Sequence, residues 1–484
     1  MGQVRHYYLG VKEEGRILFD FVGNPFVDAA VAGLTALVGK ENPRELTEED
    51  LDGALLDLPR YFFKNDGNDV RSRWRGLSGM LYARNIAFFN PKPSKEKLIE
   101  YIARFREQIV PLSDSGSCII CGRRNAIISE KITWNQIPMT SSGGLVNFNS
   151  FMSPGFAACA GCVLLMLFLP FGILAPPSKN GTTPSIFLIP HGVNKKIMLW
   201  LAQDAVRYIK QRADVPVEDI RFFFPAGNEG VIPGSANVPE VAILRIFAYL
   251  VENYLVGSNQ PLPPSHRTMD VYAIINTNQS AMVDIYRVPQ PLFDFVTEAL
   301  KHHRGELCEF LFGPNRKSEY GTMMAKRLVA GDYLLSRFIN LRNRAILGSK
   351  DLAILYAKEV LNMKKDRIRT IQKLADEVWK YLKDSKKPKR ELEILEKTRN
   401  NPAQLRAFFI RVLKAGYHIL NLDEYSEVFT EEGTWKESLD LLLIELYSRN
   451  IQDPLWEKAP DEEEEEEPEE PDREYSEKEE EDEV

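Results

Sequence analysis

Two C-x-x-C pairs constrain the fold of this 484-residue chain more than any other feature. Cys118 and Cys121 form the first pair, Cys159 and Cys162 form the second, and 37 residues separate them. A C-x-x-C turn places two thiolates on one small loop, so two such loops can enclose Zn²⁺ in a tetrahedral sulfur site. We predict a structural zinc site made by these four cysteines, with the spacer as a projecting loop or hairpin. Four thiolates leave no open position for a catalytic water.

Two other interpretations of the cysteines stay open: the pairs could be redox dithiols, or cysteines that fall close together by chance. The chain has five cysteines, and four of them lie in metal-type spacing, which favours a reducing cytosol over a disulfide framework. The polar start of the chain lacks a secretory signal pattern. The most apolar run, residues 163–175, is too short for a membrane span and predicts a buried helix. We expect a soluble, cytoplasmic protein with no membrane contact.

Charge is distributed very unevenly along the chain. Residues 461–484 carry 17 acidic and two basic residues, a net charge of −15, so the total of −8 leaves +7 for residues 1–460. Within that body, residues 320–415 hold 23 Lys and Arg against 10 Asp and Glu, a net charge of +13. The acidic tail cannot bury apolar area and is predicted to be disordered. A solvated helix face would mix both signs, so the excess in residues 320–415 favours a nucleic-acid surface over that alternative.

Hydrophobic patterning predicts a multidomain α+β protein. Residues 1–320 are expected to form a mixed α/β domain that contains the zinc element at 118–162. Its predicted strands are 15–21, 185–190, 219–225, 271–276 and 282–286, and its predicted helices are 94–111, 195–212 and 241–255. A small-residue helix is predicted to begin after Asp28 as N-cap and to end near Gly39, and a capping box at Thr47 to start another helix.

Residues 321–460 change in character, because apolar residues recur there at helical spacing. We predict an all-α bundle for this segment, followed by the disordered tail at 461–484. Seven of its basic residues are candidates for contacts with a nucleic-acid backbone. They are Arg337, Arg342, Arg344, Lys364, Lys365, Arg367 and Arg369.

Two further groups of residues are candidates for nucleic-acid contacts. Arg71, Arg73 and Arg75 alternate, so an extended chain would turn all three one way; a solvated strand face is an equally good interpretation. The zinc spacer carries short amides and hydroxyls that suit contacts with base edges, although loops also use such residues to satisfy their own backbone. These candidates for reading a DNA motif are Asn135, Gln136, Ser141, Ser142, Asn147 and Asn149.

Catalytic motifs are scarce in the sequence. It contains no Walker A phosphate loop, no G-x-G-x-x-G, no G-x-S-x-G and no H-E-x-x-H. The adjacent pair His302 and His303 has no carboxylate motif beside it, which favours a surface or helix-end role. We therefore predict a binding protein and not an enzyme.

The order of these parts resembles a known family. Residues 21–29, Phe-Val-Gly-Asn-Pro-Phe-Val-Asp-Ala, with the small-residue helix and residues 45–51 after them, are similar to the N-terminus of the large subunit of type I-B CRISPR Cascade complexes. The two cysteine pairs, with Asn147 shortly before the second, and the basic C-terminal bundle also resemble that family. The resemblance covers nearly all of residues 1–460, and the acidic tail is not part of it.

The resemblance implies a non-catalytic subunit of a crRNA-guided complex in antiviral defence. Such a subunit recognises the protospacer-adjacent motif in double-stranded DNA, helps to open the duplex, stabilises the R-loop strands and recruits the helicase–nuclease. Its partners are crRNA and the backbone, handle-binding and small subunits. The C-terminal bundle resembles the small subunit, which in this family can also be made separately from an internal start codon. We predict that Met323, Met324 or a nearby Met serves as that start here. The alternatives are a zinc-ribbon DNA-binding transcription or replication factor and a metal-dependent nuclease.

Overall fold

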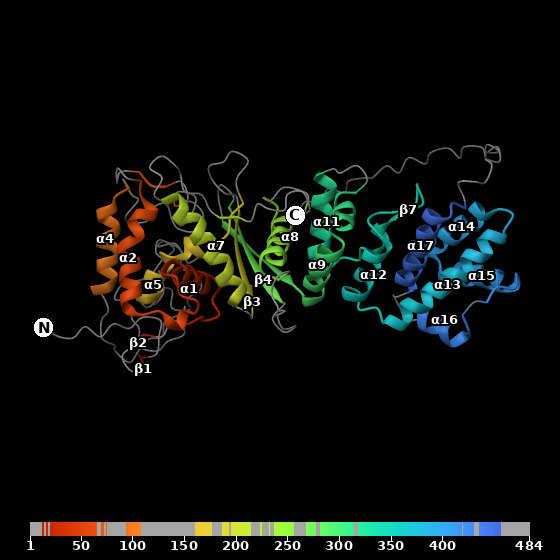
Figure 1. Ribbon diagram of the computed structural model, residues 1–484, viewed down its shortest axis with the longest axis horizontal. Coiled ribbons are helices and arrows are strands. Elements are labelled where there is room, and N and C mark those ends of the chain that lie inside the picture. The colour runs from red at the N-terminus through yellow and green to blue at the C-terminus, as the bar shows by residue number, and fades with distance from the viewer. Residues whose placement is uncertain are drawn as a thin grey trace, which may run out of the picture. The chain divides into compact units, whose positions relative to one another are not determined.

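A computed structural model describes most of the chain (Figure 1). The described residues are 12–13, 16–17, 20–64, 69–71, 74, 93–107, 160–176, 186–192, 195–213, 223–224, 232, 237–255, 268–276, 281–313, 318–418, 420–429 and 435–455. Contacts divide the chain into an N-terminal unit, Met1–Ile368, and a C-terminal unit, Arg369–Val484. Both are mostly helical, and the N-terminal unit contains a small antiparallel sheet. None of the helices described is long and apolar enough to cross a membrane.

Helix α1 (Pro25–Val38) lies at the centre of the N-terminal core. It starts at Asn24, whose side chain accepts hydrogen bonds from the amides of Phe26 and Val27, and it has proline at its first position. It ends at Gly39, which adopts the left-handed conformation with φ 83°. The predicted helix is therefore confirmed, but the predicted N-cap is wrong. Asp28 lies inside the first turn and is fully buried.

Small residues allow α1 to pack so closely against other helices that backbone atoms of the two helices are in contact. A Cβ atom at Gly172 in α6 (Leu169–Gly172) would lie 1.8 Å from the carbonyl oxygen of Ala29, and one at Gly33 would lie 2.6 Å from that of Phe168. The apolar run at 163–175 is buried throughout, as predicted, but it contains parts of two short helices, α5 (Ala160–Met166) and α6, and not one helix. Pro170 is in the first turn of α6, where a missing amide hydrogen costs little.

Three further helices complete this core. Helix α2 (Glu48–Phe62) begins with the predicted capping box, in which Thr47 and Asp50 each accept the other's backbone amide hydrogen. Helix α4 (Lys95–Glu107) contacts α2 and α5, and α7 (Lys195–Ala213) contacts α1. A short 3₁₀ turn, η1 (Pro43–Glu45), joins α1 to α2. Within the strand predicted at 15–21, the structure has the short strand β2 (Arg16–Ile17), which forms a small hairpin with β1 (Lys12–Glu13).

The sheet has the antiparallel order β3–β4–β5. Its strands are β3 (Ile186–Gly192), β4 (Met269–Asn276) and β5 (Ala281–Val288), so three of the predicted strands are confirmed. The first five residues of β3 are buried, and a bridge between Leu174 and Leu188 covers its other edge. Of the strand predicted at 219–225, the structure describes Phe223 and Phe224 alone, and they lie in no named strand.

The rest of the N-terminal unit is mainly helical. Helix α8 (Pro239–Leu250) continues into a π-helical turn, η2 (Val251–Leu255), which confirms the helix predicted at 241–255. After β5 come α9 (Gln290–His302), α10 (Arg304–Phe312) and α11 (Ser318–Ala330). A 3₁₀ turn, η4 (Leu335–Phe338), leads into a second hairpin, β6 (Ile339–Asn340) and β7 (Ala345–Ile346), and then α12 (Lys350–Glu359).

The boundary between the units differs from the one predicted after residue 320. Helix α11 contacts α8 and α10, and α12 contacts α9, so the first helices of the predicted bundle belong to the N-terminal unit. Met324 and Leu328 are buried in α11. A polypeptide that started at Met323 or Met324 would therefore begin in the middle of a packed helix.

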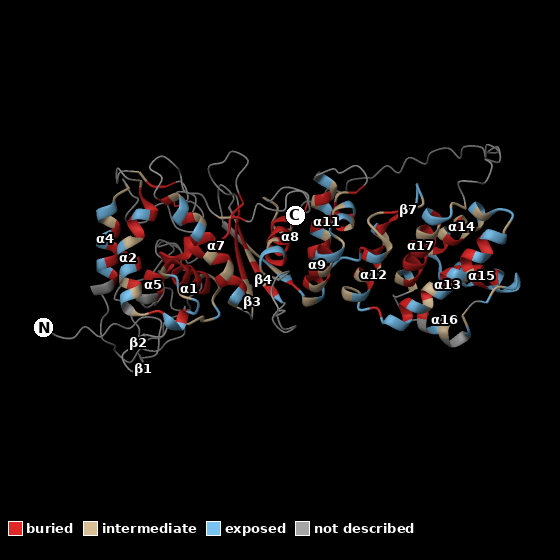
Figure 2. Cartoon of the chain, viewed as in Figure 1, coloured by how far each residue is buried: buried red, intermediate tan, exposed pale blue. Residues whose placement is uncertain are grey.

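The C-terminal unit is built around α17 (Trp435–Gln452), whose residues 438–447 are all buried (Figure 2). The other helices are α13 (Lys365–Asp384), which starts in the N-terminal unit, α14 (Pro388–Lys397), α15 (Pro402–Lys414) and α16 (Leu422–Phe429). A 3₁₀ turn, η5 (Thr398–Asn400), joins α14 to α15. The buried acidic groups of α17 are satisfied: Glu445 accepts from Gln372 and Arg449, and Asp440 pairs with Arg399.

Candidate functional site

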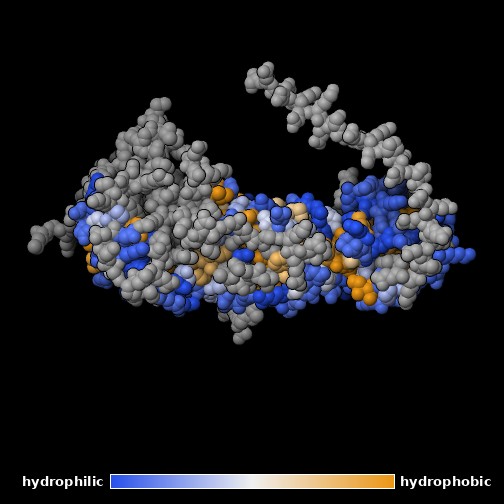
Figure 3. All heavy atoms as spheres, turned by 90° about the horizontal axis from the view of Figure 1, so that it is seen from above, coloured by the Kyte–Doolittle hydropathy of each residue, from blue (hydrophilic) through white to orange (hydrophobic). Residues whose placement is uncertain are grey.

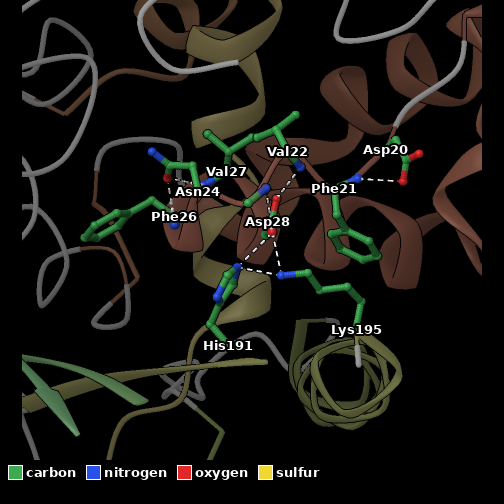
Figure 4. Close-up of polar contacts among 10 residues, drawn as sticks. Asp20, Phe21, Val22, Asn24, Phe26, Val27, Asp28, His191 and Lys195 are labelled. Atoms are coloured by element: carbon green, nitrogen blue, oxygen red, sulfur yellow. Dashed lines mark hydrogen bonds and ion pairs between the residues drawn. The ribbon is translucent and has the colours of Figure 1, made fainter. Parts of the chain in front are cut away.

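Residues 21–28 build a buried polar cluster in the N-terminal unit (Figure 4). The chain turns at Gly23, which has φ 84°, and Asn24 then caps α1. This turn brings the backbone amides of Val22 and Gly23 to the carboxylate of Asp28, at 2.7 and 3.2 Å. The sequence that carries the family resemblance is therefore also the sequence that positions this carboxylate.

Two side chains from distant parts of the chain complete the cluster. His191 at the end of β3 and Lys195 at the start of α7 both approach the same oxygen of Asp28, each at 2.9 Å. The Lys195 ammonium also lies 2.6 Å from Nε2 of His191 and 5.8 Å from the ring centre of Phe21. The carboxylate is fully buried, whereas the side chains of His191 and Lys195 are 13% and 20% exposed.

The ionised form of Asp28 is favoured by these contacts. Burial alone would raise the pKa of Asp28, but hydrogen bonds from His191 and Lys195 and the charge of Lys195 outweigh it. The pKa of this carboxyl is therefore below its usual value of 3.8. Nε2 of His191 can donate to Asp28 or accept from Lys195, but one nitrogen cannot do both, so the tautomer decides which contact is a hydrogen bond.

The cluster holds α1, β3 and α7 together and balances one buried carboxylate with one ammonium. Sequence reasoning missed this site, because it treated Asp28 as a helix cap and gave His191 and Lys195 no role. The available signal was a lone acidic residue within an otherwise small and apolar helix.

A second buried carboxylate in this unit is satisfied in a similar way. Asp204 of α7 accepts the hydroxyls of Tyr249 and Tyr254 and pairs with Arg207 at 2.7 Å. Burial, together with the hydrogen bond to Asp204, raises the pKa of both tyrosines. The ring of Tyr254 stacks on Trp200 with 4.8 Å between centres.

Arg71, predicted to contact a nucleic-acid backbone, is buried in the N-terminal unit. It is 2% exposed, and its guanidinium donates to the carbonyl oxygens of Phe63 and Ala213 at 3.1 and 2.9 Å. The amide of Trp74 donates to the carbonyl of Arg71, so the chain turns here and does not continue as a strand. Arg73 and Arg75 lie outside the described residues.

The other basic residues that were predicted to contact a nucleic-acid backbone differ in their solvent exposure. Arg337 and Arg342 are exposed next to the β6–β7 hairpin, and Arg344 in its turn is half-buried. Lys364, Lys365 and Arg369 are exposed around the start of α13. Arg367 is 7% exposed, so it lies on the packed side of that helix.

The zinc element and the motif-reading loop fall outside the residues that the structure describes. This holds for Cys118, Cys121 and Cys159 and for all six loop candidates, Asn135, Gln136, Ser141, Ser142, Asn147 and Asn149. Cys162 is described and is fully buried in α5. Within the described ranges, no group of three or more metal-ligating side chains is placed to hold an ion. The four-cysteine zinc site stays a prediction.

The C-terminal unit carries basic residues that sequence analysis counted without singling out. Lys373, Lys386, Lys389, Arg390, Lys397 and Lys414 are exposed, and among the described residues none of them has an ion-pair partner. In Figure 3, the right-hand end, where Figure 1 labels α13 to α17, is mostly hydrophilic. This surface offers flexible cations that water, salt or a polyanion can bind.

Comparison with models of protein families and with curated proteins gave no match to this chain.

Proposed function

We propose that this chain is the non-catalytic large subunit of a crRNA-guided, type I-B Cascade-like surveillance complex in antiviral defence. In this proposal it binds crRNA and the strands of the target DNA, contributes to motif recognition and duplex opening, and docks the helicase–nuclease. Its partners are the backbone, handle-binding and small subunits, and it works in the cytoplasm. The residues 21–29 motif and the charge pattern are the basis of the proposal.

The unpaired cations of the C-terminal unit support this proposal best. A protein that contacts nucleic-acid strands without reading their sequence needs flexible positive charges along the backbone path. Lys386, Lys389 and Arg390 provide such charges on a folded helical unit, because they are exposed and have no carboxylate partner among the described residues. In this proposal the loop between the cysteine pairs recognises the DNA motif, and structural Zn²⁺ holds the loop in place.

Co-purification tests the assignment. The chain is expressed with a crRNA and candidate backbone and handle-binding subunits, and the purified assembly is analysed for RNA and subunit content. We expect the chain to join an RNA-containing assembly and to bind isolated nucleic acid only weakly, without sequence preference and with strong dependence on salt. If the chain alone prefers one duplex sequence by about 10³-fold or more, the transcription or replication factor is the better assignment. Divalent-dependent cleavage by the isolated chain would instead favour the nuclease.

The zinc site and the loop are tested separately. Metal analysis of the purified chain should find about one Zn²⁺ per chain, and replacing Cys118 and Cys121 with Ser should remove it. Alanine at Asn135, Gln136, Asn147 and Asn149 together should abolish motif preference in the assembled complex. If the motif preference is unchanged in this variant, the loop does not read the motif.

The separate C-terminal polypeptide is a further part of the proposal. Leucine at both Met323 and Met324 should abolish it if translation starts there. A C-terminal polypeptide that persists in the purified complex of this variant would rule out both starts. Met363 is then the next methionine, two residues before α13 begins.

A further inference from the structure

Five basic side chains crowd the turn between α13 and α14. They are Lys383, Lys386, Lys387, Lys389 and Arg390, all exposed, and the eight-residue segment 383–390 contains one acidic residue, Asp384, for a net charge of +4. Asp384 accepts the hydroxyl of Tyr417 at 2.5 Å. We call this segment the basic turn.

The end of α15 extends the basic turn. Arg411 pairs with Glu391 in the first turn of α14 at 3.2 Å, and Tyr417 bonds to Asp384 at the end of α13. These two contacts place the last turn of α15 beside the basic turn. That last turn carries exposed Lys414 and the apolar side chain of Leu413, which is 57% exposed. A ligand on this surface would therefore meet cations from three helices.

The chain leaves α17 at the same place. Asp453, directly after the last residue of α17, forms an ion pair with Lys383. The acidic segment 461–484 begins six residues after the last described residue, Leu455. Six residues span at most roughly 20 Å, so the start of the acidic segment stays close to the basic turn. A short connection of this kind gives the tail an effective concentration on the order of millimolar at the turn.

We propose that the acidic segment 461–484 binds the basic turn of its own chain when no nucleic acid is present. The segment has a net charge of −15 and consists largely of Glu, so it presents to these lysines the charge pattern of a polyanion. Individual exposed ion pairs contribute little, but many carboxylates tethered beside several cations act together. The contact is electrostatic and exposed to water, so salt weakens it.

Docking of the tail has a consequence for binding, and this consequence rests on the proposed function. A nucleic-acid backbone and the tail would compete for the same lysines. The tail would then suppress weak contacts with arbitrary strands, whereas a strand held by the assembled complex would displace it. The docking itself does not depend on what the protein binds.

Zero-length carbodiimide cross-linking of the full chain tests the docking directly, because it joins a lysine to a carboxylate only at contact distance. We expect tail carboxylates to link to Lys386 and Lys389 at least about fivefold more often than to Lys436, and the links to disappear in about 0.5 M NaCl. Lys436 is the matched control, because it is also exposed but lies at the start of α17, roughly 25 Å of helix away from the tail. Equal labelling of Lys436 and the basic turn would overturn the proposal. So would links that form mainly between isotopically labelled and unlabelled chains.

A double-variant cycle tests the competition with an oligothymidylate of about 20 nucleotides as the probe. A chain that ends at Pro460 should bind the probe about tenfold more tightly than the full chain. The same truncation should raise the affinity for the probe only slightly in K386E/K389E/R390E. In that variant the tail does not bind the turn, so its removal exposes no further cations. An equal gain in both backgrounds would mean that the tail repels the probe without docking, and would overturn the proposal. If no variant binds the probe, the proposed function fails, and the cross-linking result alone decides the docking.

Discussion

The cluster around Asp28 and the basic turn of the C-terminal unit use charge in opposite ways. Asp28 is fully buried and has four partners within 3.2 Å, two backbone amides and the side chains of His191 and Lys195. Lys386, Lys389 and Arg390 are exposed and have no ion-pair partner among the described residues. A buried charge is tolerated only when it is paired, whereas an exposed cation stays available to an outside ligand.

This difference separates residues that maintain the fold from residues that can recognise a partner. Substitution at the first kind should change stability and leave nucleic-acid binding to the remaining folded protein unaltered. Substitution at the second kind should do the reverse. Arg71 and Lys389 are both basic. Arg71 is buried and belongs to the residues that maintain the fold, whereas Lys389 is exposed and belongs to those that can recognise a partner.

Removal of the Asp28 carboxylate should have the largest effect. Asp28→Ala leaves Lys195 and His191 without their partner and should destabilise the N-terminal unit by about 3 kcal/mol, the lower end of the range for a broken buried pair because Lys195 keeps some contact with water. Amide hydrogen exchange of α1 and α7 peptides measures this locally, which a global melt of a two-unit chain cannot do. Unchanged exchange in α1 would show that the cluster is not a structural element.

Steric packing gives a test of the same unit that does not involve charge. Gly172→Ala should destabilise it by about 1–3 kcal/mol, since the new methyl group would meet the backbone of Ala29. Gly53→Ala in α2 is the control, because nothing lies within 4 Å of the added atom, and it should be neutral or stabilising by up to about 1 kcal/mol. Equal effects of the two substitutions on hydrogen exchange in α1 would contradict the close packing of α1 and α6.

Arg71 and Lys389 provide the direct comparison between the two kinds of basic residue. Arg71→Ala leaves two buried carbonyl groups without their donor and should destabilise the N-terminal unit by about 1–3 kcal/mol. Lys389→Ala should leave stability within about 0.5 kcal/mol of the parent. Hydrogen exchange and oligonucleotide binding are measured for both variants. A binding defect in folded Arg71→Ala, or a stability defect in Lys389→Ala, would reverse the assignment.

Acid should weaken the Asp28 cluster in a defined direction. Because the pKa of Asp28 is lower in the folded than in the unfolded state, the stability that it contributes is present above pH 3.8 and is lost as the pH falls toward the folded pKa. The difference in α1 protection between the parent and Asp28→Asn should therefore shrink as the pH is lowered below about 4. A difference that stays constant down to pH 2 would show that the carboxylate is not preferentially ionised in the fold.

Local sequence signals predicted most elements of the fold. The capping box at Thr47, the alternation in the strands and the helical spacing in 195–212 are short-range patterns, and they gave the correct elements. The N-cap of α1 was wrong because both Asn24 and Asp28 suit such a position; Pro25, which favours the first helical turn, was the deciding signal. The contact-defined units divide the chain at a different place from the predicted boundary, because periodicity shows that α11 has an apolar face but not which helices cover it.

The candidate site was less predictable than the fold. Asp28 meets His191 and Lys195 across more than 160 positions of sequence, and no local pattern connects them. Arg71 donates to the carbonyl of Ala213, which is 142 positions away in the chain. Charge counting did identify residues 320–415 as basic, but it could not separate exposed Lys389 from buried Arg367.

The salt dependence of oligonucleotide binding tests most directly whether the basic turn is a recognition surface. Binding of the oligothymidylate probe is measured from about 50 to 200 mM salt for the chain that ends at Pro460, with and without alanine at Lys386, Lys389 and Arg390. Each phosphate contact on a single strand contributes about 0.7 to the slope of log K against log salt, so the triple variant should lower the slope by about 2. An unchanged slope with unchanged affinity would contradict this account.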